Sequence, residues 1–157
     1  MERLVPDKTA VIVVDIQERL TAAMPERRVA DVVRATTVLV ESARLLGAPV
    51  FATVQYTKGL GPMIASVATV LGAASVVPVE KTQFSAADAP GFVDALKAAR
   101  VTDVVVVGME THVCVYQTAR DLVGLGTPCT SPRTACVRGA TTCETWASGS
   151  SHALARR

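Results

Sequence analysis

One stretch decides the fold of this chain, Val104-Val105-Val106-Val107-Gly108-Met109-Glu110-Thr111-His112-Val113-Cys114-Val115. Consecutive β-branched residues are typical of a strand that is buried on both faces, as in a parallel sheet. We expect Gly108 to end this strand and Thr111 to cap the helix that follows. Cys114 then falls in the first turn of that helix, where free backbone N–H groups favour a thiolate. The stretch therefore predicts either an activated nucleophile or a small buried side chain, which is the common state of a free cysteine.

Composition narrows the fold and the class of function. The chain has 157 residues, enough for one domain with its own core, and 50% of them are hydrophobic. Its net charge is +2 and it has no basic stripe with interleaved aromatic residues, so we predict no nucleic-acid partner. No apolar run approaches the roughly 20 residues of a membrane-spanning helix, and the start lacks a signal-peptide pattern. We therefore expect a cytoplasmic protein with no membrane partner.

Strand and helix patterns alternate on both sides of the opening stretch. Strand patterns occur at residues 9–15, 50–55 and 75–79, and helix patterns at about 28–46, 63–71, 90–99 and 112–123. Gly47 should end the first of these helices. Pro78 should place its strand at the edge of the sheet, because proline donates no hydrogen bond. The alternation predicts an α/β fold, a three-layer α/β/α arrangement around a parallel sheet.

Three reactive side chains follow three of the predicted strands. Asp15 ends the first strand, Lys81 follows the edge strand, and Cys114 follows the valine strand. Because ligands bind beyond the carboxyl ends of the strands in open α/β sheets, we expect the three side chains to meet at one rim. Each also has a structural interpretation: a helix cap, a surface residue and a core side chain, respectively. Together, a carboxylate, an ammonium and a thiol predict nucleophilic catalysis.

Three segments resemble the signature blocks of the isochorismatase-like cysteine hydrolases, a superfamily that includes nicotinamidases and N-carbamoylsarcosine amidase. They are Val13-Val14-Asp15-Ile16-Gln17, Glu80-Lys81-Thr82-Gln83-Phe84-Ser85 and Gly108-Met109-Glu110-Thr111-His112-Val113-Cys114-Val115. The segment 54–62 is most similar to the isochorismatase-domain-containing subgroup. The resemblance covers about residues 8–126 and implies a sheet of order 3-2-1-4-5-6. It also implies a small-molecule substrate, no cofactor and a homo-oligomer.

By that resemblance, Asp15, Lys81 and Cys114 match the family's catalytic triad. Asp15 would take the thiol proton and later deliver it to a leaving amine, while Lys81 would keep the carboxylate charged and stabilise the thiolate. Cys114 would attack a carbonyl or imine carbon and form a thioester-type intermediate. The family has a cis peptide bond before the cysteine, here Met109–Glu110, which would aim the backbone N–H groups of Glu110 and Cys114 at an oxyanion. The implied reaction is hydrolysis of a small amide or a related C–N bond.

The remaining site predictions concern the substrate pocket and a metal. The residues expected to line the pocket are Gln17, Gln55, Tyr56, Phe84 and Met109. Metal-binding nicotinamidases carry an Asp-x-His element near the end of the second strand, and residues 53–56 contain neither residue type, so we predict no metal. A pair between Cys114 and His112 is disfavoured, because side chains two residues apart at a helix start point in different directions.

Residues 127–157 depart from the family pattern. They contain neither a strand run nor a convincing amphipathic helix, so they do not predict strands 5 and 6 of the expected sheet. We therefore predict an incomplete hydrolase domain over 1–126 and an atypical tail over 127–157. Codon degeneracy permits a family-like strand in another reading frame after Gly126, so we hypothesise that the tail is a frame-shifted product. A native tail would leave the valine strand beside an open edge of the sheet. The alternative to the hydrolase function is a weakly active or inactive relative that acts as an interaction module.

Overall fold

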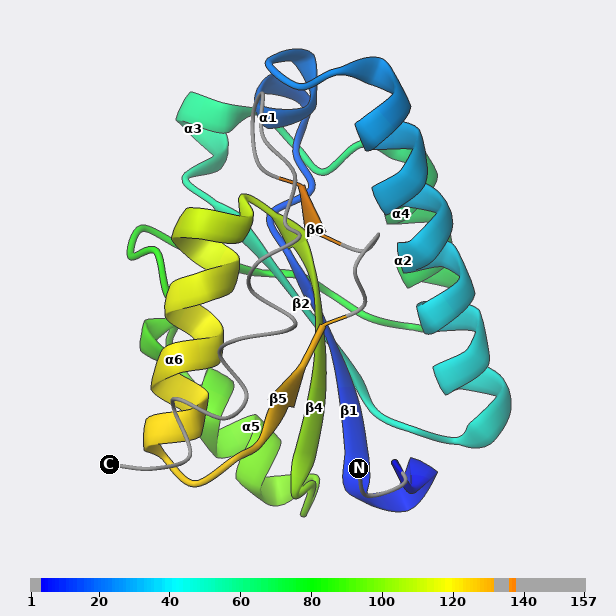
Figure 1. Cartoon of the computed structure of the whole chain (residues 1–157), viewed down its shortest axis with the longest axis vertical. Coiled ribbons are helices and arrows are strands. Elements are labelled where there is room, and N and C mark those ends of the chain that lie inside the picture. Colours follow the sequence, from blue (N-terminus) through cyan, green and yellow to red (C-terminus); the bar gives the residue numbers. More distant parts are fainter. Residues whose placement is uncertain (1–3, 132–135, 138–157) are drawn as a thin grey trace.

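The structure is a computed structural model that describes residues 4–131 and 136–137 (Figure 1). Parallel strands form its central sheet: β1 (Thr9–Val14), β2 (Val50–Gln55), β3 (Val79–Lys81), β4 (Asp103–Met109), β5 (Cys129–Thr130) and β6 (Cys136–Val137). Their order is β3-β2-β1-β4-β5, and β6 also pairs with β4. The predicted α/β fold class is confirmed, and β1 and β4 form its centre.

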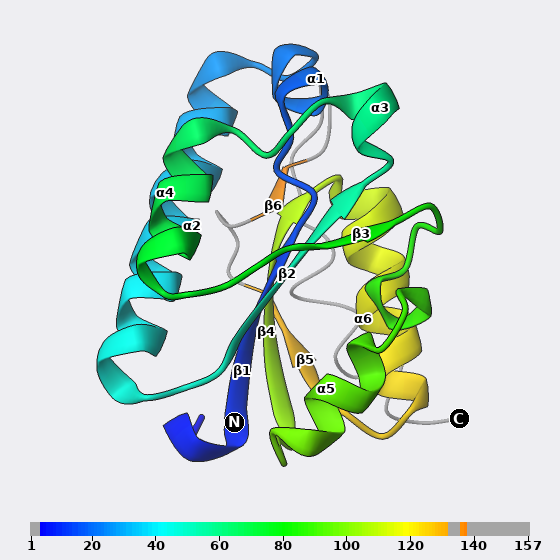
Figure 2. The ribbon, with the colours of Figure 1, turned by 180° about the vertical axis from the view of Figure 1, so that it is seen from behind.

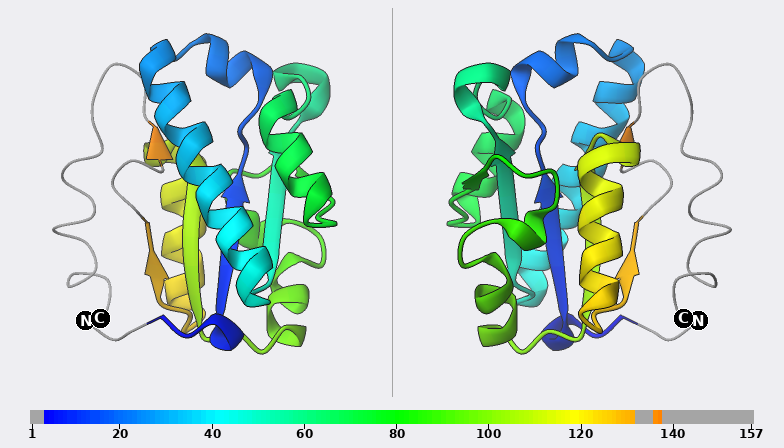
Figure 3. Two further views of the ribbon diagram at one scale, coloured as in Figure 1. Left: turned by 90° about the vertical axis from the view of Figure 1, so that its right-hand side faces the viewer. Right: turned by 90° about the vertical axis from the view of Figure 1, so that its left-hand side faces the viewer.

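Helices cover both faces of this sheet (Figure 3). They are α1 (Glu18–Ala22), α2 (Glu26–Leu46), α3 (Thr57–Leu60), α4 (Ala65–Ala73), α5 (Phe92–Ala98) and α6 (Tyr116–Gly124), with short 3₁₀ turns η1 (Pro6–Lys8) and η2 (Ala86–Asp88) and a π-helical turn η3 (Thr111–Val115). Gly47 ends α2 as predicted, because its φ of 70° is left-handed and its N–H bonds back to the last turn. Among the described residues, no helix is long and apolar enough to cross a membrane.

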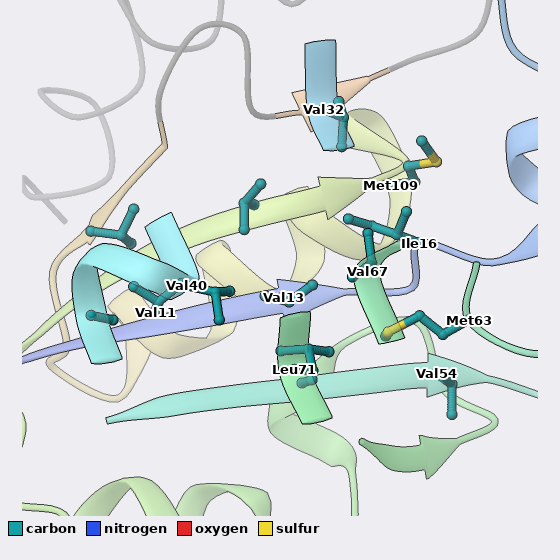
Figure 4. Close-up of a cluster of buried hydrophobic side chains, with 14 residues drawn as sticks. Val11, Val13, Ile16, Val32, Val40, Val54, Met63, Val67, Leu71 and Met109 are labelled. Carbon is teal, nitrogen blue, oxygen red and sulfur yellow. The ribbon is translucent and has the colours of Figure 1, made fainter. Parts of the chain in front are cut away.

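The core lies in two layers because side chains alternate along each strand. Val11 and Val13 of β1 pack with α2 and α4 on one face (Figure 4). Ile12 and Val14 pack with α5 and α6 on the other face, where Phe92 fills the space beside them. Every residue of β1 is buried, which explains why the sequence shows a continuous apolar run instead of an alternating one.

The edge strand differs from its prediction. The sequence pattern placed a strand at residues 75–79, whereas β3 begins at Val79 and pairs with β2 at Thr53–Gln55 (Figure 2). Val77 is 85% exposed. Because Pro78 has no N–H to donate to the ladder, pairing starts only after it. This shift brings Lys81 into the last position of the strand, opposite Gln55.

The far edge of β4 is covered by two short strands that lie one after the other. β5 pairs with β4 at Val104 and Val105, and β6 pairs at Gly108 and Met109. The tail therefore does form strand pairs, contrary to the pattern-based expectation, because an open strand edge accepts any extended backbone. In the described part of the chain no strand extends the sheet beyond β5. Most of the predicted frame-shifted tail lies outside the described residues.

Candidate active site

A buried ion pair joins the ends of β1 and β3. The Nζ atom of Lys81 lies 2.5 Å from Oδ2 of Asp15. Asp15 is 0% exposed and Lys81 is 2% exposed, although both side chains carry charge. The backbone of Asp15 has a φ of 51°, a left-handed conformation that turns the chain directly after β1. Burying two charges is costly unless they are paired and fully hydrogen-bonded, so the contacts that surround this pair decide whether it can be kept.

Neighbouring side chains complete the hydrogen bonding of the pair. Thr53 of β2 donates its hydroxyl to Oδ1 of Asp15 at 2.8 Å. Lys81 donates two further hydrogen bonds, to Oε1 of Gln55 at 3.0 Å and to the carbonyl of Gln83 at 3.2 Å. With the bond to Asp15, all three ammonium protons have an acceptor. The network fixes the carboxylate and the ammonium in one geometry.

Cys114 lies beside this pair, in the π-helical turn η3 that follows β4. The charges of Asp15, Lys81 and Glu110 all act on its thiol. Burial is the largest cause that raises the pKa of Cys114, the charge of Asp15 adds to it, and Lys81 opposes it, with a resulting pKa of about 12. The expectation that the helix start favours a thiolate was wrong in direction, because desolvation and a neighbouring carboxylate outweigh the lowering effects.

The backbone before Cys114 is tightly constrained. Gly108 does not end β4, which continues to Met109. Gly108 has a φ of 144°, and a Cβ atom there would lie 2.0 Å from the carbonyl oxygen of Val14. The peptide bond between Met109 and Glu110 is cis. Thr111 does not cap the next helix: its hydroxyl is buried and accepts or donates no hydrogen bond among the described residues.

The residues predicted to line the pocket have three different environments. Gln17 donates to the carbonyls of Gln55 and Gly61 at 2.9 and 2.7 Å, and its Oε1 accepts the N–H of Gln55 at 2.7 Å. Both polar atoms of its amide are therefore hydrogen-bonded to the backbone, so this side chain stabilises the site and does not face a substrate. Tyr56 and Phe84 are both 52% exposed, at positions that follow β2 and β3.

Met109 was predicted to line the pocket, and its position differs from that prediction. Its side chain is fully buried in the core cluster on the α2 side, close to Ile16 and Val32 (Figure 4). The alternation of side chains along β4 explains this placement, because Met109 shares a face with Val105 and Val107. Gln55 is likewise committed, since Nε2 donates to the carbonyl of Thr82 at 2.9 Å while Oε1 accepts from Lys81.

A separate hollow lies at the other end of β2. It has a volume of about 500 Å³, and its lining includes Val50, Phe51, Val77, Pro90 and Phe92. None of the predicted site residues lines it. In residues 4–131 and 136–137, no group of three metal-ligating side chains gathers at either place.

A family model described as Isochorismatase domain matches residues 9–150. The chain belongs to the isochorismatase family. Isochorismatase domain-containing protein 1 of Danio rerio is 39% identical over 132 residues, which cover 78% of this chain and 42% of that protein. Isochorismatase domain-containing protein 2A of Mus musculus is 32% identical over 128 residues, covering 79% of this chain and 57% of that protein. The chain thus spans about half the length of the curated relatives it matches.

Solved structures of the family share the fold. A MAR1 ribonuclease from Caenorhabditis elegans superimposes with a TM-score of 0.77 at 32% identity, covering 86% of this chain and 67% of that one. The YcaC gene product of Escherichia coli, described as an octameric hydrolase of unknown specificity, gives a TM-score of 0.75 at 23% identity, covering 86% and 66%. The resemblance inferred from the sequence motifs is therefore confirmed at the level of family and fold.

Sequence reasoning missed two supporting groups of this isochorismatase-family site. Thr53, which holds the Asp15 carboxylate, is a polar residue in a strand that is buried at that point. Thr118 of α6 accepts the backbone N–H of Ala86 at 2.9 Å and so ties the loop after Lys81 to the helix after Cys114. A signal existed for Thr53, because a buried polar residue in a strand needs a partner. The partner itself could not be named without the strand register.

Proposed function

We propose that this isochorismatase-family chain is a cysteine hydrolase that cleaves a small amide or a related C–N bond with Cys114, Asp15 and Lys81. The observation that carries the proposal is the buried Asp15–Lys81 ion pair at the ends of β1 and β3, with the Cys114 thiol close enough for both charges to act on it. A thiol needs a general base beside it to become a nucleophile, and the proposal assigns that role to Asp15.

The proposed reaction has two steps. Asp15 takes the thiol proton as the Cys114 sulfur attacks the carbonyl carbon, so that a C–S bond forms. The C–N bond then breaks, and the amine leaves with the proton held by Asp15. Water attacks the thioester with Asp15 as base, the C–S bond breaks, and the proton returns to the sulfur. The backbone N–H groups of Glu110 and Cys114 are proposed to hold the oxyanion in both steps.

Lys81 acts through charge in this scheme. Its three protons are engaged by Asp15, Gln55 and Gln83, so it does not donate a proton to the substrate. Its charge lowers the pKa of Cys114 and so opposes the effects of burial and of Asp15. It therefore stabilises the thiolate at the moment when Asp15 has become neutral, because the negative charge has then moved to sulfur.

The test is a hydrolysis assay combined with trapping of the acyl enzyme. A panel of small primary amides is incubated with the chain, released ammonia is measured, and acid-quenched protein is mapped by mass spectrometry. We expect ammonia release together with an acyl group on Cys114. Both should be lost in Cys114→Ala and kept in Cys129→Ala, which removes a partly buried thiol outside the site. Hydrolysis that survives in Cys114→Ala contradicts the mechanism, and a folded chain that hydrolyses no amide supports the interaction-module alternative.

The homo-oligomer implied by the family resemblance remains a prediction for this chain. One family structure is described as an octamer, and that description concerns the longer Escherichia coli protein. Sedimentation of the purified chain, compared with its mass of 16.4 kDa, measures the assembly directly.

A further inference from the structure

Glu110 is a charged residue of the site that the proposed reaction does not use through its side chain. It directly follows β4 and is half-buried. Its carbonyl oxygen accepts the N–H groups of Val113 at 3.1 Å and of Val115 at 3.3 Å. These bonds close η3 around Cys114 and hold the Glu110 residue in the same turn as the thiol.

Among residues 4–131 and 136–137, no side chain of opposite charge pairs with the carboxylate of Glu110. Within the described residues it forms no ion pair and no hydrogen bond, although it lies near enough to Cys114 to raise the pKa of the thiol. The charged groups that act on the thiol are Asp15, Lys81 and Glu110. Asp15 and Lys81 neutralise each other, so the carboxylate of Glu110 leaves the site with an excess negative charge.

The other polar side chains of the described site are not free to bind an anionic substrate. Every proton of Lys81 already has an acceptor within the chain. The amides of Gln17 and Gln55 are likewise committed to their neighbours. His112 is exposed and is not among the groups that act on the thiol. Within the described site, only the buried hydroxyl of Thr111, in the same turn, remains without a partner, and it is neutral.

We propose, on the basis of the proposed hydrolase function, that Glu110 is a specificity-determining residue that selects amides carrying a cationic group, an ammonium or a guanidinium. A half-buried carboxylate without a partner is stabilised by a ligand cation that replaces its lost hydration. An anionic amide meets repulsion from the same carboxylate, and the described residues place no free cation near the thiol. A neutral amide binds without this electrostatic stabilisation and without the repulsion.

The first test measures charge selection at the thiol without requiring turnover. Cationic and anionic methanethiosulfonate reagents (MTSET and MTSES) are compared for their rates of modification of Cys114, mapped by mass spectrometry. Cys129 provides the internal reference, because burial alone raises the pKa of that thiol. We expect the cation-to-anion rate ratio at Cys114 to exceed that at Cys129 by about tenfold and to lose that excess in Glu110→Gln. Such a factor corresponds to about 1.4 kcal/mol.

Controls separate this inference from a general effect of charge or folding. Glu41→Gln removes a surface carboxylate that pairs with Arg44 on α2 and should leave the ratio unchanged. In the wild-type chain, added salt should shrink the cationic preference. A ratio that is the same in the wild type and Glu110→Gln overturns the inference. If that variant does not fold, a wild-type ratio that equals the Cys129 ratio, or that is insensitive to salt, overturns it instead.

The second test uses three amides of equal length that end in an ammonium, a methyl group or a carboxylate. Glu110→Gln should lower the ratio of kcat/KM between the cationic and the anionic amide by about tenfold, with the neutral amide measured in the same variant as the reference for both. Hydrolysis with no charge preference in the wild type overturns the inference and leaves the hydrolase proposal intact. Absence of all hydrolysis contradicts the hydrolase proposal, and the reagent test still decides whether Glu110 selects charge.

Discussion

The replacement Asp15→Asn should change the two reactivities of Cys114 in opposite directions. With a pKa of about 12, only about one Cys114 side chain in ten thousand is ionised at a pH of about 8. Burial is the largest cause of this raised pKa, the charge of Asp15 adds to it, and Lys81 opposes it. Removing the carboxylate's charge while keeping its shape leaves Lys81 to favour the thiolate. A fall of about one pKa unit makes the thiolate about ten times more abundant.

Alkylation by iodoacetamide therefore should become about tenfold faster at Cys114, because the thiolate is the reacting form. Amide hydrolysis should fall by about 100-fold or more, because the general base is gone. The assay follows both cysteines by peptide mapping over a pH series, and Cys129 reports any loosening of the fold in the same sample. If Cys114 becomes slower in Asp15→Asn, or is unchanged relative to Cys129, Asp15 does not hold the thiol protonated and cannot be assigned as its base.

Two stability predictions follow from the same region. Lys81→Met leaves the buried Asp15 charge without its partner and should lower the free energy of unfolding by about 3–5 kcal/mol. The double variant Asp15→Asn/Lys81→Met should recover most of that loss. Urea unfolding of the wild type and both variants measures these changes, and a single variant as stable as the wild type would contradict the buried ion pair. Gly108→Ala should prevent folding or lower the free energy of unfolding by about 3 kcal/mol or more, because its Cβ atom would lie 2.0 Å from the carbonyl oxygen of Val14. Gly72→Ala in α4 is the control, since its Cβ atom meets nothing within 4 Å and the change should raise the free energy of unfolding by up to about 1 kcal/mol. Similar unfolding midpoints for the two variants would rule out the close approach at Gly108.

The main elements of the fold were predictable from local patterns. The apolar runs of β1 and β4 predicted strands buried on both faces, and the structure has them at the centre of the sheet. The helical periodicity before Gly47 predicted α2 and its end. These predictions succeed because side-chain periodicity and glycine conformation depend on near neighbours. The strand before Lys81 was misplaced because Pro78 blocks pairing, and β-pairing depends on a distant partner.

The candidate site was predictable in its residues more than in its chemistry. The rule that ligand sites lie at the carboxyl ends of parallel strands brought Asp15 and Lys81 to one rim, and they form an ion pair there. The rule gave no information on Thr53, which holds the carboxylate, or on Gln17, whose amide is consumed by backbone contacts. Those contacts join residues far apart in the chain and depend on the register between β1 and β2.

The sequence by itself determined the alternating strands and helices, the family motifs and the three reactive residues at strand ends. Only the tertiary structure decided the state of the thiol. A cysteine near a helix start is expected to be acidic from local dipoles alone, yet the pKa of Cys114 is raised to about 12. The physical reason is that desolvation and the charge of Asp15, which raise this pKa, arise from groups that the fold packs around the sulfur. The same packing leaves the carboxylate of Glu110 beside the nucleophile without a partner among the residues that the structure describes.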